Sequence, residues 1–135
     1  MSGKPFLNTN VLAHAYTLDE RRNERATTLI SECGVVSVQV LNEFVDVCRK
    51  KLRLGWNEIA QALADLEELL DPAVPLTTDL HREGVRLARL HGFRIYDALI
   101  LAAANRAGCP VLYSEDMQDG QVIGGVRVRN PFLGF

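Results

Sequence analysis

The stretch "IYDALILAAANRAGCPVLYSED", residues 95–116, decides the fold because it joins a buried helix to a buried strand. Apolar side chains occupy nearly every face over residues 96–107, which predicts a helix at the centre of the molecule. Residues 111–114 then predict a short strand. Asp97 opens the helix and Asp116 follows the strand, so each element has an acid at one end. The stretch predicts an α/β protein.

The rest of the chain alternates in the same way. Thr9 or Asn10 can cap the first helix, and Gly34 is expected to end the second. Helices are expected at residues 11–16, 19–33, 39–52, 56–70 and 78–92. Further strands are expected at residues 6–7, 35–38, 72–77 and, as a sheet edge, 126–129. Strands alternating with helices predict a parallel sheet covered on both faces, in one domain over residues 1–135.

Composition narrows the class of protein. Hydrophobic residues at 47% and charged residues at 24% are typical of a globular chain, and the net charge of -2 excludes a broadly basic protein. The three cysteines have no metal-binding spacing, which indicates reduced thiols in the cytosol. Residues 1–5 contain no signal-peptide core, and the longest apolar run, residues 98–104, is too short to span a bilayer. We expect a cytoplasmic protein with no membrane segment.

Four polar residues are expected at the carboxyl edge of this sheet, where α/β proteins bind ligands. They are Asn8, Glu43, Asp97 and Asp116. Taken singly, each residue has an ordinary structural explanation. Asn8 can cap a helix, and Glu43 can be a solvated residue at the edge of a helix face. Asp97 can be stabilised by the helix dipole in a first turn, and Asp116 can be a turn residue. Together, crowded carboxylates repel one another unless a divalent cation neutralises them. Hard oxygen ligands suit Mg²⁺ or Mn²⁺, and such ions drive phosphodiester hydrolysis.

Four segments of the sequence contain these residues and together resemble a known protein family. In chain order they are "FLNTNVLAHAY", "VSVQVLNEFVDVCRKK", "IYDALILAAANRAGC" and "LYSEDMQDGQVIGGVRVRNPF". The chain resembles PIN-domain proteins, and specifically the VapC-type toxins of toxin–antitoxin pairs, over nearly its whole length. The resemblance implies a three-layer α/β/α sandwich and a Mg²⁺-dependent ribonuclease that hydrolyses RNA. It also implies a homodimer that binds a small antitoxin protein.

The resemblance also assigns roles to residues of this chain. The catalytic and metal-binding quartet is Asn8, Glu43, Asp97 and Asp116. Supporting polar residues near the metal are Thr9, Asn10, Ser114 and, as an extra acid, Asp119.

Asn8 departs from the family, whose first block normally reads Asp-Thr-Asn. An amide oxygen can touch a cation but brings no charge, so metal binding and activity should be weakened. The loss of one such electrostatic element costs on the order of 10²–10³ in rate. Three origins are open: an engineered substitution, a natural branch that has lost activity, or an enzyme that tolerates the amide. The intact acids at the other three positions favour the first.

Basic residues near the acidic site are candidates for phosphate contacts. Arg49, Lys50 and Lys51 end the helix that carries Glu43, although cations also suit a helix C-terminus. The helices at 39–52 and 56–70 can form a groove for a partner's helix, with Trp56 as an anchor there or as a core or corner residue.

Two rival classes remain to be compared with the nuclease. A catalytically silent module that binds RNA or protein is the plain interpretation of a natural Asn8. A receiver-type phosphoacceptor would need a lysine after its last strand, and no lysine follows Lys51. The histidines, His14, His81 and His91, share no motif and are expected to be structural.

Overall fold

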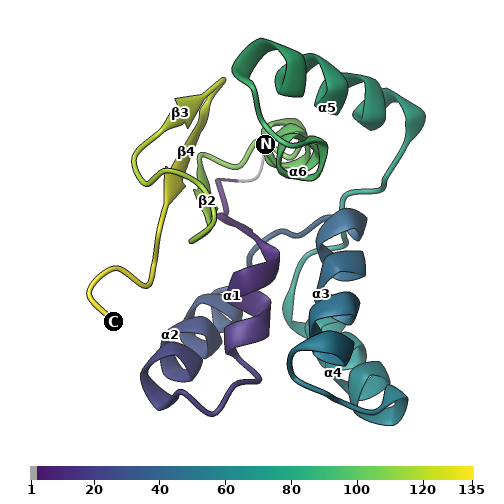
Figure 1. Cartoon of the computed structure of the whole chain (residues 1–135), viewed down its shortest axis with the longest axis vertical. Coiled ribbons are helices and arrows are strands. Elements are labelled where there is room, and N and C mark those ends of the chain that lie inside the picture. Colours follow the sequence, from purple (N-terminus) through teal and green to yellow (C-terminus); the bar gives the residue numbers. More distant parts are fainter. Residues whose placement is uncertain (1–2) are drawn as a thin grey trace.

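The sheet brings together strands from both ends of the chain (Figure 1). The computed structural model describes residues 3–135; residues 1 and 2, part of the segment examined for a signal peptide, lie outside them. The strands are β1 (Phe6–Leu7), β2 (Val111–Tyr113), β3 (Val122–Ile123) and β4 (Val126–Arg129). Their order is β1-β2-β4-β3, with β1, β2 and β4 parallel and β3 antiparallel to β4.

Two extended segments widen the sheet beyond β1. Val35 pairs in parallel with Phe6, and Ser37 pairs in parallel with Val74. The strands expected at residues 35–38 and 72–77 are thus single bridges. The first is cut short because the Ser37 side chain accepts from the Val40 N–H and starts a helix at Val38. The second contains two prolines, which cannot donate to a ladder.

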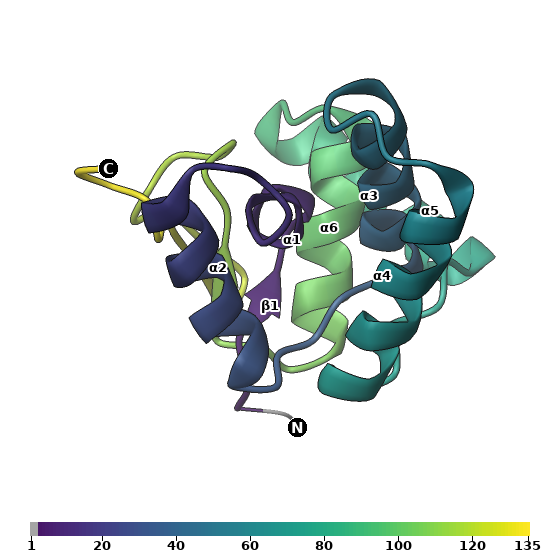
Figure 2. The same ribbon diagram turned by 90° about the horizontal axis from the view of Figure 1, so that it is seen from below.

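Six helices surround this sheet in residues 3–135. They are α1 (Thr9–His14), α2 (Glu20–Ser31), α3 (Val38–Lys50), α4 (Trp56–Leu69), α5 (Thr78–His91) and α6 (Ile95–Arg106). None of them, within the described range, has the length and apolar character needed to cross a membrane. Figure 2 shows α2 and α6 on opposite sides of β1, so helices flank the sheet as the three-layer prediction requires.

Two predicted helix boundaries are wrong. The cap of α1 is Asn8, one residue before the expected Thr9 or Asn10, because the Asn8 side chain accepts from the Thr9 N–H. The second helix ends at Ser31, before Gly34, and the residue in a left-handed conformation is Cys33, with φ 61°.

The central helix of the prediction is confirmed in α6, where residues 98–104 are all buried. Helix α5 covers it at close range. An added Cβ on Gly84 of α5 would lie 2.6 Å from Leu99 Cδ2, so a larger residue there requires the Leu99 side chain to shift.

The prediction that residues 126–129 form the sheet edge is wrong. Strand β4 lies between β2 and β3, because Gly124 turns the chain back with φ 57° and lets β3 pair along the outer side of β4. The outermost strand on this side is therefore β3, with two residues.

Candidate metal site at the carboxyl ends of the strands

Strands β1 and β2 end side by side and place Asn8 next to Ser114. Leu7 pairs with Tyr113, and the Asn8 N–H donates to the Tyr113 carbonyl at 3.1 Å. The Asn8 side chain then donates from Nδ2 to Ser114 Oγ at 2.9 Å and accepts from the Thr9 N–H at Oδ1, at 2.7 Å. Asn8 is only 1% exposed, so this hydrogen bonding satisfies a buried amide at both ends.

The same network fixes Asp116. Its backbone N–H donates to Ser114 Oγ at 3.1 Å, and its carboxylate oxygen Oδ2 accepts from Asn10 Nδ2 at 3.0 Å. Asn10 Oδ1 in turn accepts from the Glu115 N–H at 3.3 Å. Asn10, in the first turn of α1, therefore holds the loop after β2 with both the nitrogen and the oxygen of its side-chain amide.

Glu43 and Asp116 both line a cleft of about 250 Å³ formed by α1, α3 and the loop after β2. Gln39, one turn earlier on α3, donates from Nε2 to Glu43 Oε2 at 3.0 Å. Burial raises the pKa of Glu43; the Gln39 hydrogen bond opposes the rise, and the charges of Asp97 and Asp116 add to it.

Asp97 lies in the first turn of α6 and is half-buried. Burial raises the pKa of Asp97, Arg94 opposes the rise and Asp116 adds to it. Asp97 does not line the cleft that Glu43 and Asp116 share. The structure therefore brings three predicted acids within electrostatic range of one another, with Asp97 beside the cleft.

These donors suit a hard cation that keeps part of its water shell. In the described chain, no three His, Cys, Asp or Glu side chains stand close enough to form a complete metal cage. Mg²⁺ does not require one, since it commonly takes one or two carboxylates and completes its shell with water and substrate phosphate. Glu43, Asp97 and Asp116 offer such carboxylates, whereas Asn8 offers an amide that is already hydrogen-bonded at both atoms.

The remaining predicted residues have structural contacts. Thr9 is buried, and its hydroxyl donates to the Val40 carbonyl at 3.5 Å, joining α1 to α3. Asp119 is exposed and accepts from the Asn130 N–H at 2.8 Å, outside the lining of the cleft.

The sequence analysis missed two residues at the site. His14 lines the cleft, its Nε2 lies 2.6 Å from Glu115 Oε1, and its ring packs on Phe132 with centroids 4.5 Å apart. Arg94 lies close enough to oppose the rise in the pKa of both Asp97 and Glu43. Helical spacing was the available signal, because His14 is four residues after Asn10 and Arg94 is three before Asp97.

The three basic residues predicted at the end of α3 have different surroundings. Lys51 lines the cleft with Glu43 and Asp116. Lys50 Nζ lies 3.1 Å from Asp46, and both side chains are largely exposed. The guanidinium carbon of Arg49 lies 4.7 Å from the ring centroid of Trp56. Only Lys51 therefore belongs to the cleft itself.

Comparisons with known proteins identify the family and the fold. The family model for the PIN domain matches residues 6–118. No curated protein matches the sequence. Among solved structures, VapC20 from Mycobacterium tuberculosis, a toxin that cleaves the sarcin–ricin loop, is similar with a TM-score of 0.68 and 20% identity, over 87% of this chain and 91% of that one.

Two further structures contain protein partners. A toxin–antitoxin complex from Klebsiella pneumoniae aligns with a TM-score of 0.71 and 17% identity, covering 95% of this chain and 98% of that one. VapBC2 from Rickettsia felis, bound to a DNA fragment from its promoter, aligns with a TM-score of 0.65 and 16% identity, covering 93% and 97%. At these identities the likeness establishes the fold, and the family match establishes the relationship: the chain belongs to the PIN-domain family and has the fold of its VapC toxins.

Proposed function

We propose that the chain is a metal-dependent endoribonuclease toxin of a toxin–antitoxin pair, with activity reduced or lost because residue 8 is Asn. The observation that carries this proposal is the cleft shared by Glu43 and Asp116, with Asp97 in electrostatic range of both. Proteins of this family are generally nucleases, which supports the reaction class. The three free cysteines support a reducing, cytoplasmic setting.

In this proposal Glu43, Asp97 and Asp116 hold Mg²⁺ or Mn²⁺. When bound, such a cation supplies an activated water and offsets charge on the scissile phosphate. The chain's own groups position the ligands: Asn10 orients the Asp116 carboxylate at 3.0 Å, and Gln39 orients Glu43 at 3.0 Å. We further propose that Lys51, which lines the same cleft, contacts an RNA phosphate.

RNA cleavage by Asn8→Asp beside the unchanged chain tests the proposal. We expect cleavage by Asn8→Asp with Mg²⁺ or Mn²⁺, at least about 10²-fold faster than by the unchanged chain, and none after chelation. The double variant Asn8→Asp/Asp116→Asn should lose this activity. If Asn8→Asp binds the metal but cuts neither structured nor unstructured RNA, the nuclease proposal is wrong.

A catalytically silent binding module is the second candidate, and the hydrogen bonding of Asn8 favours it. The amide brings no charge to a cation, and both its nitrogen and its oxygen already have a hydrogen-bond partner, in Ser114 and Thr9. Titration calorimetry of the unchanged chain with Mn²⁺ discriminates between the two. A weakened nuclease retains measurable affinity at its three acids, whereas a silent module need not.

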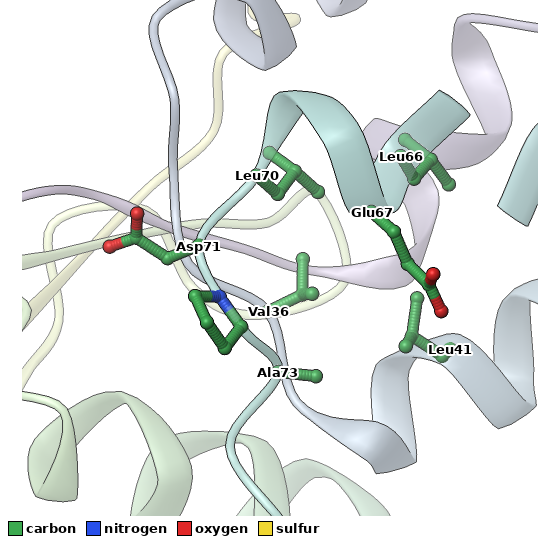
Figure 3. Close-up of a pocket in the computed structure, with 8 residues that line it drawn as sticks. Val36, Leu41, Leu66, Glu67, Leu70, Asp71 and Ala73 are labelled. Atoms are coloured by element: carbon green, nitrogen blue, oxygen red, sulfur yellow. The ribbon is translucent and has the colours of Figure 1, made fainter. Parts of the chain in front are cut away.

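We propose an antitoxin as the protein partner, since several similar structures are toxin–antitoxin complexes. Two apolar cavities flank α4 and share Leu66. One, of about 350 Å³, is lined by Leu41 of α3, and Figure 3 shows Val36, Leu41 and Leu66 around it with Glu67 beside Leu41. The other, of about 450 Å³, opens toward α1 and α2.

The cavity between α1, α2 and α4 is the better seat for an antitoxin helix. Its lining combines Tyr16 and Ile30 with Leu69, and the carboxylates of Asp65 and Glu68 border it. An amphipathic helix with an apolar face and basic flanks complements that surface. Leu69→Asp should therefore abolish suppression of RNA cleavage by the antitoxin, while Leu41→Asp in the other cavity should not.

We also propose a homodimer, as the family resemblance implies. Four exposed apolar side chains lie on α5 or beside its ends, and we place the interface there for that reason. They are Leu76, Val85, Leu90 and Tyr96. Sedimentation equilibrium should give a dimer for the unchanged chain and a monomer for Val85→Glu; a dimer that survives this change excludes α5 as the interface.

A further inference from the structure

Trp56 forms an exposed aromatic surface at the corner between α3 and α4. The residue is 62% exposed, so the core role considered from the sequence is wrong. The Arg49 guanidinium lies 4.7 Å from the ring centroid, and Arg49 Nη1 donates to the Leu54 carbonyl at 3.1 Å. That hydrogen bond fixes the guanidinium against the indole, and most of Trp56 still faces solvent.

The surroundings of this stack are positively charged although the whole chain is not. Residues 46–58 contain four cations and two acids, whereas the chain carries a net charge of -2. The two acids are partly engaged: Asp46 pairs with Lys50 at 3.1 Å, and Glu58 accepts from the Gly55 N–H at 3.1 Å. An anionic ligand is therefore favoured at this corner.

The cleft runs from the acids along α3 to the carboxyl end of that helix. Glu43, Val47 and Lys51 follow one another at four-residue intervals along α3, and all three line the cleft. Glu43 and Lys51 are eight residues apart, about 12 Å along the helix axis. Arg49 is two residues before Lys51, about 200° around the helix, so a nucleic-acid strand whose phosphate lies at the acids can contact Lys51 and then pass around the end of α3 to the Arg49–Trp56 stack.

An unpaired base is the group that matches an exposed indole with a stacked guanidinium. Bases stack on aromatic side chains and on arginine planes in single-stranded RNA, whereas the faces of paired bases are already stacked inside a helix. An antitoxin helix would instead need a concave apolar surface, and Trp56 lines none of the cavities beside α4.

We propose that Trp56, held by Arg49, is a stacking site for an unpaired base of the RNA strand that enters the acidic cleft, and that it selects unpaired over paired RNA. This inference rests on the proposed ribonuclease function.

Trp56 reports on its own contacts, because it is the only tryptophan in the chain. We would titrate the chain with a short oligoadenylate, and with its duplex with oligouridylate, in the presence of a chelator to prevent cleavage. Trp56 emission should be quenched by the single strand and barely changed by the duplex. Anisotropy of the labelled oligonucleotides measures binding independently.

Variants then separate stacking from folding. Trp56→Leu should weaken single-strand binding at least about fivefold, whereas Trp56→Phe should retain most of the affinity. Val122→Ala, at an exposed apolar position on β3 outside the cleft, is the matched control and should bind like the unchanged chain. Circular dichroism confirms that each variant is folded.

The results that would contradict the stacking site differ from those that would contradict the nuclease proposal. Bound RNA with unchanged Trp56 emission, or equal quenching by the duplex, would overturn the stacking site and leave the nuclease proposal standing. If Trp56→Leu spares RNA binding but abolishes inhibition by an antitoxin, Trp56 belongs to a protein interface. If Asn8→Asp cleaves no RNA, the nuclease proposal itself fails, whatever the emission shows.

Discussion

Ser114 Oγ accepts hydrogen bonds from both the Asn8 side chain, at 2.9 Å, and the Asp116 backbone, at 3.1 Å. Its single hydrogen is therefore free to be donated elsewhere. An aspartate at position 8 can keep the same contact with donor and acceptor exchanged, since Ser114 would donate to the new carboxylate. The surrounding structure thus accommodates the Asn8→Asp change geometrically, and its cost is electrostatic.

Asn8→Asp should make the stability of the protein depend on metal. A carboxylate at a position 1% exposed is costly without a neutralising cation, so the melting temperature should fall in chelator. Mn²⁺ at about 100 times its Kd should restore about 2.7 kcal/mol of unfolding free energy. Differential scanning calorimetry with and without Mn²⁺ measures both effects.

The control for this prediction is Asn42→Asp, which adds the same charge at a more accessible position next to Glu43 in sequence. It should change the melting temperature little in either condition. Equal metal dependence in both variants would mean that general charge, and not position 8, governs metal binding.

Glu43→Gln should stabilise the metal-free protein at neutral pH. The pKa of Glu43 is raised in the folded state, so its favourable contribution is present below the unfolded pKa and is lost as pH rises through the folded pKa. Glutamine does not ionise, so the variant does not lose stability as the pH rises. Its melting temperature should exceed that of the unchanged chain at about pH 7, and the two should converge at about pH 4. A constant difference across that range would exclude titration of Glu43 as the cause.

Lys51→Gln should reduce the salt dependence of RNA binding. Removing one phosphate contact to a single strand lowers the slope of log K against log salt by about 0.7. Lys50→Gln is the matched comparison and should have a smaller effect, because Lys50 is paired with Asp46. Equal slopes for Lys51→Gln and the unchanged chain would remove Lys51 from the RNA contact.

Gly84→Ala should destabilise the packing of α5 on α6. The new methyl group would lie 2.6 Å from Leu99 Cδ2 and 3.0 Å from Cγ, so a buried side chain must move, at a cost of about 1–3 kcal/mol. Urea unfolding with an unchanged m value measures this cost. Gly125→Ala meets nothing within 4 Å and should stay within about 0.5 kcal/mol.

Local signals account for the part of the fold that the sequence predicts well. The predicted helices agree with the structure to within about two residues at each end, because apolar periodicity and caps such as Thr77 act over a few positions. The segment at Val35 is harder to predict, since an apolar run favours a strand until the cap at Ser37 begins a helix. The hairpin that covers β4 was missed, although two adjacent glycines, Gly124 and Gly125, were its signal.

The candidate site, like the fold, has a part that local sequence signals predict and a part that they do not. Strand and helix ends predict that Asn8, Glu43 and Asp116 lie near one another, because parallel strands share a carboxyl edge. The pairing of His14 with Glu115 at 2.6 Å joins two segments far apart in sequence, and no local pattern connects them. The exposure of Trp56, the first residue of α4, likewise depends on the orientation of α4 relative to α3, which the spacing of apolar residues does not specify.

Strand β1 pairs with β2, so the first strand of the chain has its partner near the other end of the sequence. Asn8 and Ser114 are 106 residues apart, and the same separation divides Asn10 from Asp116. During synthesis the helices can form as they emerge, but this long-range ladder cannot close until residues 111–129 have been added. The acidic cleft is thus completed only after the segment that contains β2 and Asp116 has been synthesised, and a nascent chain that stops before it carries Glu43 and Asp97 without Asp116 beside them.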